Sequence, residues 1–97
     1  MTEWKDATSY SRSETKGADP RTWEVQLGEA KLIVTRFHGL EGWWMLCYKY
    51  GIREHQDLRE FHLENAQQVA LRRFQQLAQN AIIDANNALQ AADTLIQ

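Results

Sequence analysis

Cysteine and histidine are the side chains of this sequence best suited to nucleophilic catalysis or metal binding. The chain has one cysteine, Cys47, and three histidines, His38, His55 and His62. A nucleophilic cysteine needs a base held beside it, and no spacing in the chain assigns one of the histidines to that role. Cys47 lies in a strongly apolar run, so we expect it to be a small buried apolar side chain.

Metal binding and acid–base catalysis find equally little support in the spacing. His55 and His62 are seven residues apart, which on a helix puts them two turns apart, too far for one ion. His38 and Cys47 form no known zinc pattern. Paired catalytic carboxylates need a cleft. The carboxylates that stand near one another in the sequence, Glu54, Asp57, Glu60 and Glu64, belong instead to a charged run that we expect to be solvated. We therefore expect no catalytic residue, no metal site, no cofactor and no enzymatic activity.

Composition bounds the kind of protein. Of the 97 residues, 43% are hydrophobic and 25% are charged, which is typical of one folded domain, here residues 1–97, and too apolar for a disordered chain. No apolar run reaches the roughly 18 residues needed to cross a membrane. A single cysteine fits a reducing compartment, so we expect a cytoplasmic protein. The formal net charge of −2 disfavours general binding to nucleic acid.

The polar N-terminal segment, residues 1–21, is predicted to dock on this domain as an edge strand. Its residues Trp4, Asp6, Thr8 and Tyr10 stand at alternate positions, which suits a strand with one apolar side. A disordered tail is the alternative. Because such tails rarely contain Trp and Tyr, we expect at least one of the two aromatic side chains to pack on the domain.

Residues 22–51 are predicted to form an antiparallel β-meander. Trp23, Val25 and Leu27 alternate with polar residues and are followed by the tight-turn pair Gly28–Glu29. The three strands of the meander are expected at 23–27, 31–37 and 43–50. The N-terminal segment would add a fourth strand at the edge.

The third predicted strand is apolar on both faces. Because side chains alternate along a strand, one face carries Trp43, Met45 and Cys47. The opposite face carries Trp44, Leu46, Tyr48 and Tyr50. One helix covers only one face of a sheet, so the other face must be covered by the N-terminal segment, a second copy or a partner.

Residues 61–97 are predicted to form one long amphipathic helix, preceded by a charged linker at 52–60. No glycine or proline interrupts residues 52–97, and from about Leu63 apolar side chains recur with spacings of 3, 4 and 4. This 11-residue period is close to that of an undistorted helix. A strict seven-residue repeat is not sustained over the whole length, because Gln67 and Arg73 would fall in it.

The predicted helix is too long for the sheet. Thirty-odd helical residues span about 50 Å, whereas a strand of six to eight residues spans about 20 to 27 Å. We expect one long or bent helix whose C-terminal half projects and lies at a subunit interface. A break near Gln79–Asn80 is the alternative.

Charge and residue size also favour an interface on the projecting half. From 74 to 97 the only charged residues are Asp84 and Asp93, whereas an exposed helix usually carries charges of both signs. A merely polar surface is the alternative. We expect a homodimer. The candidate interface residues are Trp44, Tyr48, Tyr50, Ala81, Ala85, Ala88 and Ala92.

Nucleic-acid binding is an alternative function. Three antiparallel strands followed by a helix are similar to part of a double-stranded-RNA-binding domain. The candidate contacts in that case are Arg36, Lys49 and Arg53. The basic residues form no stripe along one element, so we do not expect nucleic acid to be the partner.

Four features occur together in residues 4–50: Trp4, the element Ser9–Arg12, the strand start Pro20–Trp23 and the later Trp43. In this combination the segment resembles a small family of uncharacterised phage and prophage proteins. The resemblance implies a protein of a mobile element. Small acidic phage proteins without catalytic motifs often bind and block a host protein, as anti-CRISPR proteins do, so by analogy we expect a non-enzymatic inhibitor with a host protein as its target. The alternatives are a homo-oligomeric structural or assembly protein and a weak RNA- or DNA-binding module.

Overall fold

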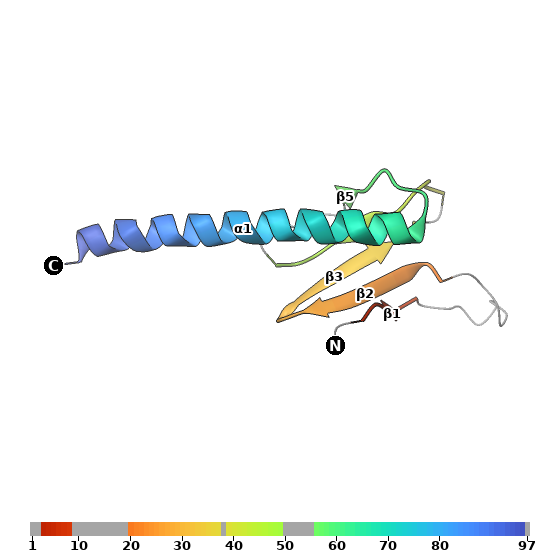
Figure 1. Cartoon of the computed structure of the whole chain (residues 1–97), viewed down its shortest axis with the longest axis horizontal. Helices are drawn as coiled ribbons and strands as arrows, with labels where there is room; N and C mark the ends of the chain where they lie inside the picture. Colours follow the sequence, from red (N-terminus) through yellow and green to blue (C-terminus); the bar gives the residue numbers. More distant parts are fainter. Residues whose placement is uncertain (1–2, 9–19, 38, 50–55, 97) are drawn as a thin grey trace.

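The computed structural model describes residues 3–8, 20–37, 39–49 and 56–96. In these residues one antiparallel sheet of five strands packs against a long helix (Figure 1). The strands are β1 (Lys5–Asp6), β2 (Thr22–Leu27), β3 (Ala30–Thr35), β4 (Trp44–Leu46) and β5 (Gln56–Asp57), and the helix is α1 (Leu63–Leu95). The strand order in the sheet, β1-β2-β3-β4-β5, is the order in the chain. The predicted α+β class, a meander followed by one long C-terminal helix, is confirmed.

The β2–β3 hairpin forms the centre of the sheet. Val25 pairs with Leu32 across it, and the alternate residues of both strands share one apolar face. Gly28 has a φ of 63°. It stands at the first central position of the two-residue turn, where a type II′ hairpin turn favours glycine. On the opposite face the hairpin is polar, and the ammonium of Lys31 lies 3.5 Å from a carboxylate oxygen of Glu24.

The N-terminal segment docks as the predicted edge strand, because β1 pairs antiparallel with β2. Beyond β1, the hydroxyl oxygen of Thr8 accepts the backbone N–H of Arg21 at 2.8 Å and that of Thr22 at 3.0 Å. Trp4 packs against the core. Tyr10, the other aromatic side chain expected to dock, lies outside the described residues. The alternative of a disordered tail is therefore wrong for residues 3–8.

The last two strands differ from the prediction. The third meander strand, expected at 43–50, is only Trp44–Leu46. The segment expected to be a charged linker contains the edge strand β5. It is held by backbone hydrogen bonds of 2.9 Å from Trp43 N–H to the carbonyl of Glu60 and from Leu58 N–H to the carbonyl of Trp43. Leu58 is buried in the core, and this burial anchors an otherwise charged segment.

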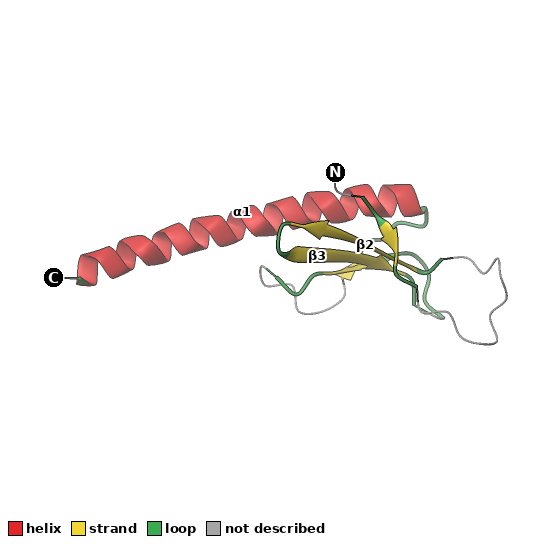
Figure 2. Ribbon diagram, turned by 90° about the horizontal axis from the view of Figure 1, so that it is seen from below, coloured by secondary structure: helices red, strands yellow, loops and turns green. Residues whose placement is uncertain are grey.

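Helix α1 covers the apolar face of the sheet with its first half. Its contact side chains include Ala66 and Ala70, both fully buried, packed with Leu32, Val34 and Met45 of the strands. The two alanines have no side chain beyond Cβ, so the helix backbone lies close to the sheet. Figure 2 shows the strands beneath this part of α1.

The second half of α1 projects beyond the sheet as one continuous helix (Figure 1). Every residue from 82 to 96 is exposed, and the principal extents of the molecule are 65 × 24 × 23 Å. The alternative of a break near Gln79–Asn80 is wrong, because α1 continues through these residues without interruption. The start of the helix at Leu63 is where the apolar period begins.

Candidate binding surface

Of the cysteine and the three histidines considered for catalysis or metal binding, the structure describes Cys47 and His62. Cys47 is a free thiol, fully buried in the apolar core. His62 is the exposed residue that precedes helix α1, and His38 and His55 lie outside the described residues. In the part of the chain that the structure describes, no group of three or more His, Cys, Asp or Glu side chains could hold a metal ion.

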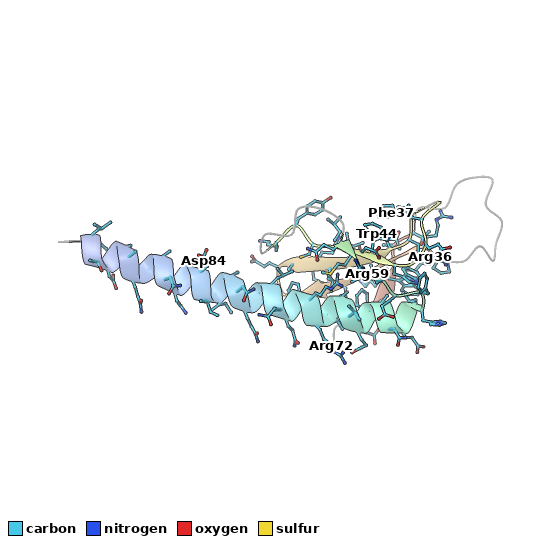
Figure 3. All side chains as sticks on the ribbon, turned by 90° about the horizontal axis from the view of Figure 1, so that it is seen from above. Arg36, Phe37, Trp44, Arg59, Arg72 and Asp84 are labelled. Atoms are coloured by element: carbon cyan, nitrogen blue, oxygen red, sulfur yellow. The ribbon has the colours of Figure 1, made fainter. Side chains whose placement is uncertain are left out.

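The adjacent tryptophans of the third meander strand have different surroundings. Trp43 is buried in the core beneath α1, and the guanidinium of Arg36 lies 5.5 Å from the centre of its ring. Trp44 is half-buried and meets Phe37 edge to face, with ring centres 5.8 Å apart and planes at 74°. Figure 3 shows Arg36, Phe37 and Trp44 together at the end of the sheet away from the projecting helix. Trp43 is therefore the core residue of the pair.

The other predicted contacts on the sheet are scattered. Tyr48 follows β4 and is 78% exposed. Arg36 follows the end of β3 that pairs with the start of β4, whereas Lys49 follows the other end of β4, and both side chains are exposed. Tyr50 and Arg53 lie outside the described residues. The two described nucleic-acid candidates thus lie at opposite ends of one short strand and form no common basic patch.

The projecting half of α1 exposes large apolar side chains that the prediction left out. Of the predicted alanines, Ala81 is half-buried and Ala85, Ala88 and Ala92 are exposed. Beside them on the helix lie five large apolar side chains with high exposed fractions: Ile82 (60%), Ile83 (59%), Leu89 (65%), Leu95 (81%) and Ile96 (72%). Ile83 lies on a different side of the helix from Ile82 and Leu89. Large apolar residues in this number on one exposed helix mark an interaction surface rather than a solvated face.

A seven-residue repeat organises these side chains. It fails for α1 as a whole, but from Leu71 onward all its members except Gln75 are apolar. We call the following residues the helix seam: Leu71, Gln75, Ala78, Ile82, Ala85, Leu89, Ala92 and Ile96. Their spacings of 4 and 3 alternate, which is the pattern by which one helix packs along another. This repeat was the signal in the sequence that could have identified the large residues.

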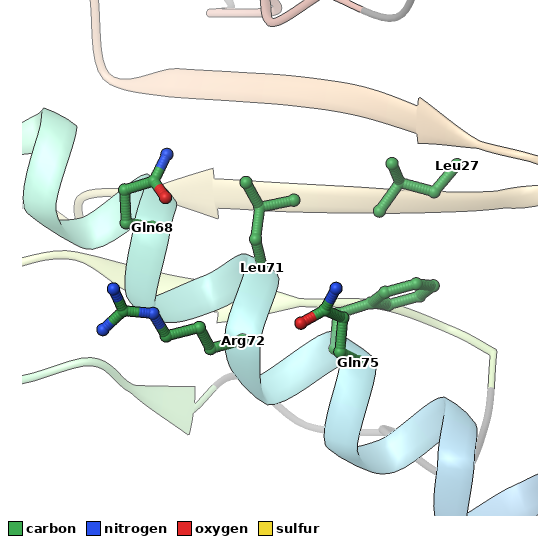
Figure 4. Close-up of a pocket in the computed structure, with 6 residues that line it drawn as sticks. Leu27, Gln68, Leu71, Arg72 and Gln75 are labelled. Carbon is green, nitrogen blue, oxygen red and sulfur yellow. The ribbon is translucent and has the colours of Figure 1, made fainter.

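The helix seam begins at an open groove between α1 and the sheet. This groove has a volume of about 440 Å³, and its apolar lining comes from Leu27 at the end of β2 and from Leu71 and Phe74 of α1. Figure 4 shows Leu27 and Leu71 between the helix and the strands, with Arg72 and Gln75 on the helix beside them. The groove can therefore accept an apolar side chain next to a positive charge.

The charges of α1 are separated along its length. The exposed Arg72 lies on the half of α1 that covers the sheet, and Asp84 lies on the projecting half (Figure 3). Arg73 donates a hydrogen bond of 3.0 Å to the carbonyl of Asp57. The last turn contains no basic residue, so the negative end of the helix dipole is uncompensated there. The helix seam thus has a positive charge beside its first residues, from Arg72, and the negative end of the helix dipole at its last residues.

Comparisons of the chain with protein-family models, with curated proteins and with solved structures find no match. Within the described residues, no helix is both long and apolar enough to cross a membrane. The resemblance of residues 4–50 to phage proteins stays a prediction, and function is inferred from the surface itself.

Proposed function

We propose that this protein is a non-enzymatic binding protein that associates with another helix through the projecting half of α1. The observation that carries this proposal is the exposure of Ile82, Leu89, Leu95 and Ile96 on a helix that continues well past its own sheet. The exposed stretch from 82 to 96 is only about as long as an isolated helix that is marginal in water, and packing of its apolar side chains against a partner would stabilise it.

The exposed side chains are numerous enough to matter energetically. Each is about 60 to 80% exposed, so covering it contributes about 1 to 2 kcal/mol. The four together contribute about 4 to 8 kcal/mol, and an equally apolar partner helix doubles that figure. Because association costs about 4 to 15 kcal/mol, the surface supports stable binding when a partner covers most of its length.

A pair of matched substitutions on the projecting half of α1 tests this proposal. Leu89→Glu places a charge in the helix seam, whereas Ile83→Glu places the same charge on an equally exposed residue outside it. Each tagged variant is used as bait in a lysate that also contains untagged copies of the chain, and retained proteins are quantified by mass spectrometry. We expect a partner that the unmodified protein and Ile83→Glu retain and Leu89→Glu loses. Identical retention by all three baits would refute the proposal.

Steric blocking of a host macromolecule is the second candidate function. It is favoured by the exposure of Tyr48, an aromatic residue of the kind that dominates binding interfaces. We expect Tyr48→Ala to weaken capture of a host protein while leaving the thermal unfolding midpoint unchanged. If phage defence by the host is the same with and without the protein, this candidate fails.

A further inference from the structure

We infer that the helix covering the helix seam belongs to a second copy of this chain, packed antiparallel so that Ile82 faces the partner's Ala85. This inference rests on the proposed function and names the partner. Four features support it when two copies of the helix are placed side by side in antiparallel orientation. These are the residues of the helix seam, the residues that flank it, the charged residues and the groove.

Small residues meet large ones in the centre of this pairing. With Ile82 opposite the partner's Ala85, the seven-residue repeat puts Leu89 opposite the partner's Ala78. The two-fold axis repeats both pairs. Each large side chain therefore fills the space that an alanine leaves, which is how well-packed helix pairs are filled.

The residues flanking the helix seam agree with the same register. On the side nearer the sheet, Ala81 lies opposite the partner's Ala88, so the two helix axes can approach to about 8 Å. On the other side, Gln79 lies opposite the partner's Asn86, and these amides can hydrogen-bond to each other.

Charge complementarity fixes the register. The pairing brings Arg72 opposite the partner's Asp93 at a flanking position, and the two-fold axis makes this pair twice. The same arrangement brings the helix end that lacks a basic residue to the arginine beside the groove. A shift by one repeat would instead place Gln79 opposite the partner's Asp93 and leave Arg72 without an acidic residue opposite.

The groove receives the end of the partner helix. In this register Ile96 lies opposite the partner's Leu71, and Leu95 lies opposite the partner's Phe74. Both facing residues line the groove together with Leu27. The two most exposed large side chains of the projecting helix thus meet the apolar depression beside the sheet. A parallel pair would leave both grooves open.

Sedimentation equilibrium between 1 and 100 μM tests the choice of partner, with circular dichroism as the check on folding. We expect a dimer for the unmodified protein and for Ile83→Glu, and a monomer for Ile82→Glu. A folded, strictly monomeric unmodified protein would overturn the inference. If the bait experiment then still finds a partner that Leu89→Glu loses, the proposed function stands, and only the inference that the partner is a second copy fails.

A charge exchange tests the register. We expect Arg72→Asp and Asp93→Arg each to raise the dimer dissociation constant by about tenfold, since each makes two like-charge pairs. In the variant that carries both substitutions, we expect the dimer dissociation constant to return to about that of the unmodified protein. Arg72→Asp combined with Asp84→Arg serves as the control, because Asp84 does not lie opposite the partner's Arg72 in this register. We expect this combination to dimerise as weakly as Arg72→Asp alone. A failure of the first combination to restore the dimer overturns the antiparallel register.

Discussion

The close contact of α1 with the sheet predicts that the helix does not tolerate a larger residue at position 70. Ala70 is fully buried between the helix and the strands. Ala70→Leu adds three carbon atoms where no room exists, and such overpacking costs about 1 to 3 kcal/mol. For a domain of this size each kcal/mol lowers the thermal unfolding midpoint by about 4 to 8 °C. A loss of about 2 kcal/mol therefore lowers it by about 8 to 16 °C.

A matched control isolates packing from helix propensity. Ala91→Leu makes the same change on the same helix at an exposed position outside the helix seam, and Ala and Leu both favour helices. Thermal unfolding followed by circular dichroism compares the two variants at one protein concentration. We expect a large decrease in the midpoint for Ala70→Leu and almost none for Ala91→Leu. Equal midpoints for the two variants would refute the close packing of α1 on the sheet.

Two further predictions concern the edges of the sheet. Leu58→Ala should lower the free energy of unfolding by about 2 to 5 kcal/mol in urea titrations, because Leu58 anchors β5 in the core. The exposed Leu40→Ala should change it little, and equal effects would show that β5 is not anchored there. Thr8→Val should cost about 1 kcal/mol, since two backbone N–H groups lose their acceptor. Thr94→Val, whose hydroxyl bonds only within the helix, is its control, and an equal loss in both would contradict the docking of the N-terminal segment.

The sequence was most informative where one period persists. The alternation of Trp23, Val25 and Leu27 predicts β2, and the apolar period predicts the start of α1 at Leu63. A two-residue strand has no period, so β5 could not be found in this way. Its anchor Leu58 is a single apolar residue within a charged run.

The binding surface was harder to predict because α1 uses two different faces. The 11-residue period follows the side that includes Ala66 and Ala70, which packs on the sheet. The helix seam lies about a quarter of a turn around the helix from these alanines. The 11-residue period continues through the alanines Ala85 and Ala92 of the candidate interface, whereas Ile82 and Leu89 fall on a second, partial stripe outside it.

The order of strands in the sheet has a consequence for the kinetics of folding. Each strand pairs only with the strands before and after it in the chain, so the described sheet requires no crossover connection. Proteins dominated by contacts between near neighbours lose less chain entropy before those contacts form, and they fold faster. The β2–β3 hairpin, closed by a two-residue turn, is the natural starting point. The nascent sheet then offers α1 the apolar face on which its first half docks.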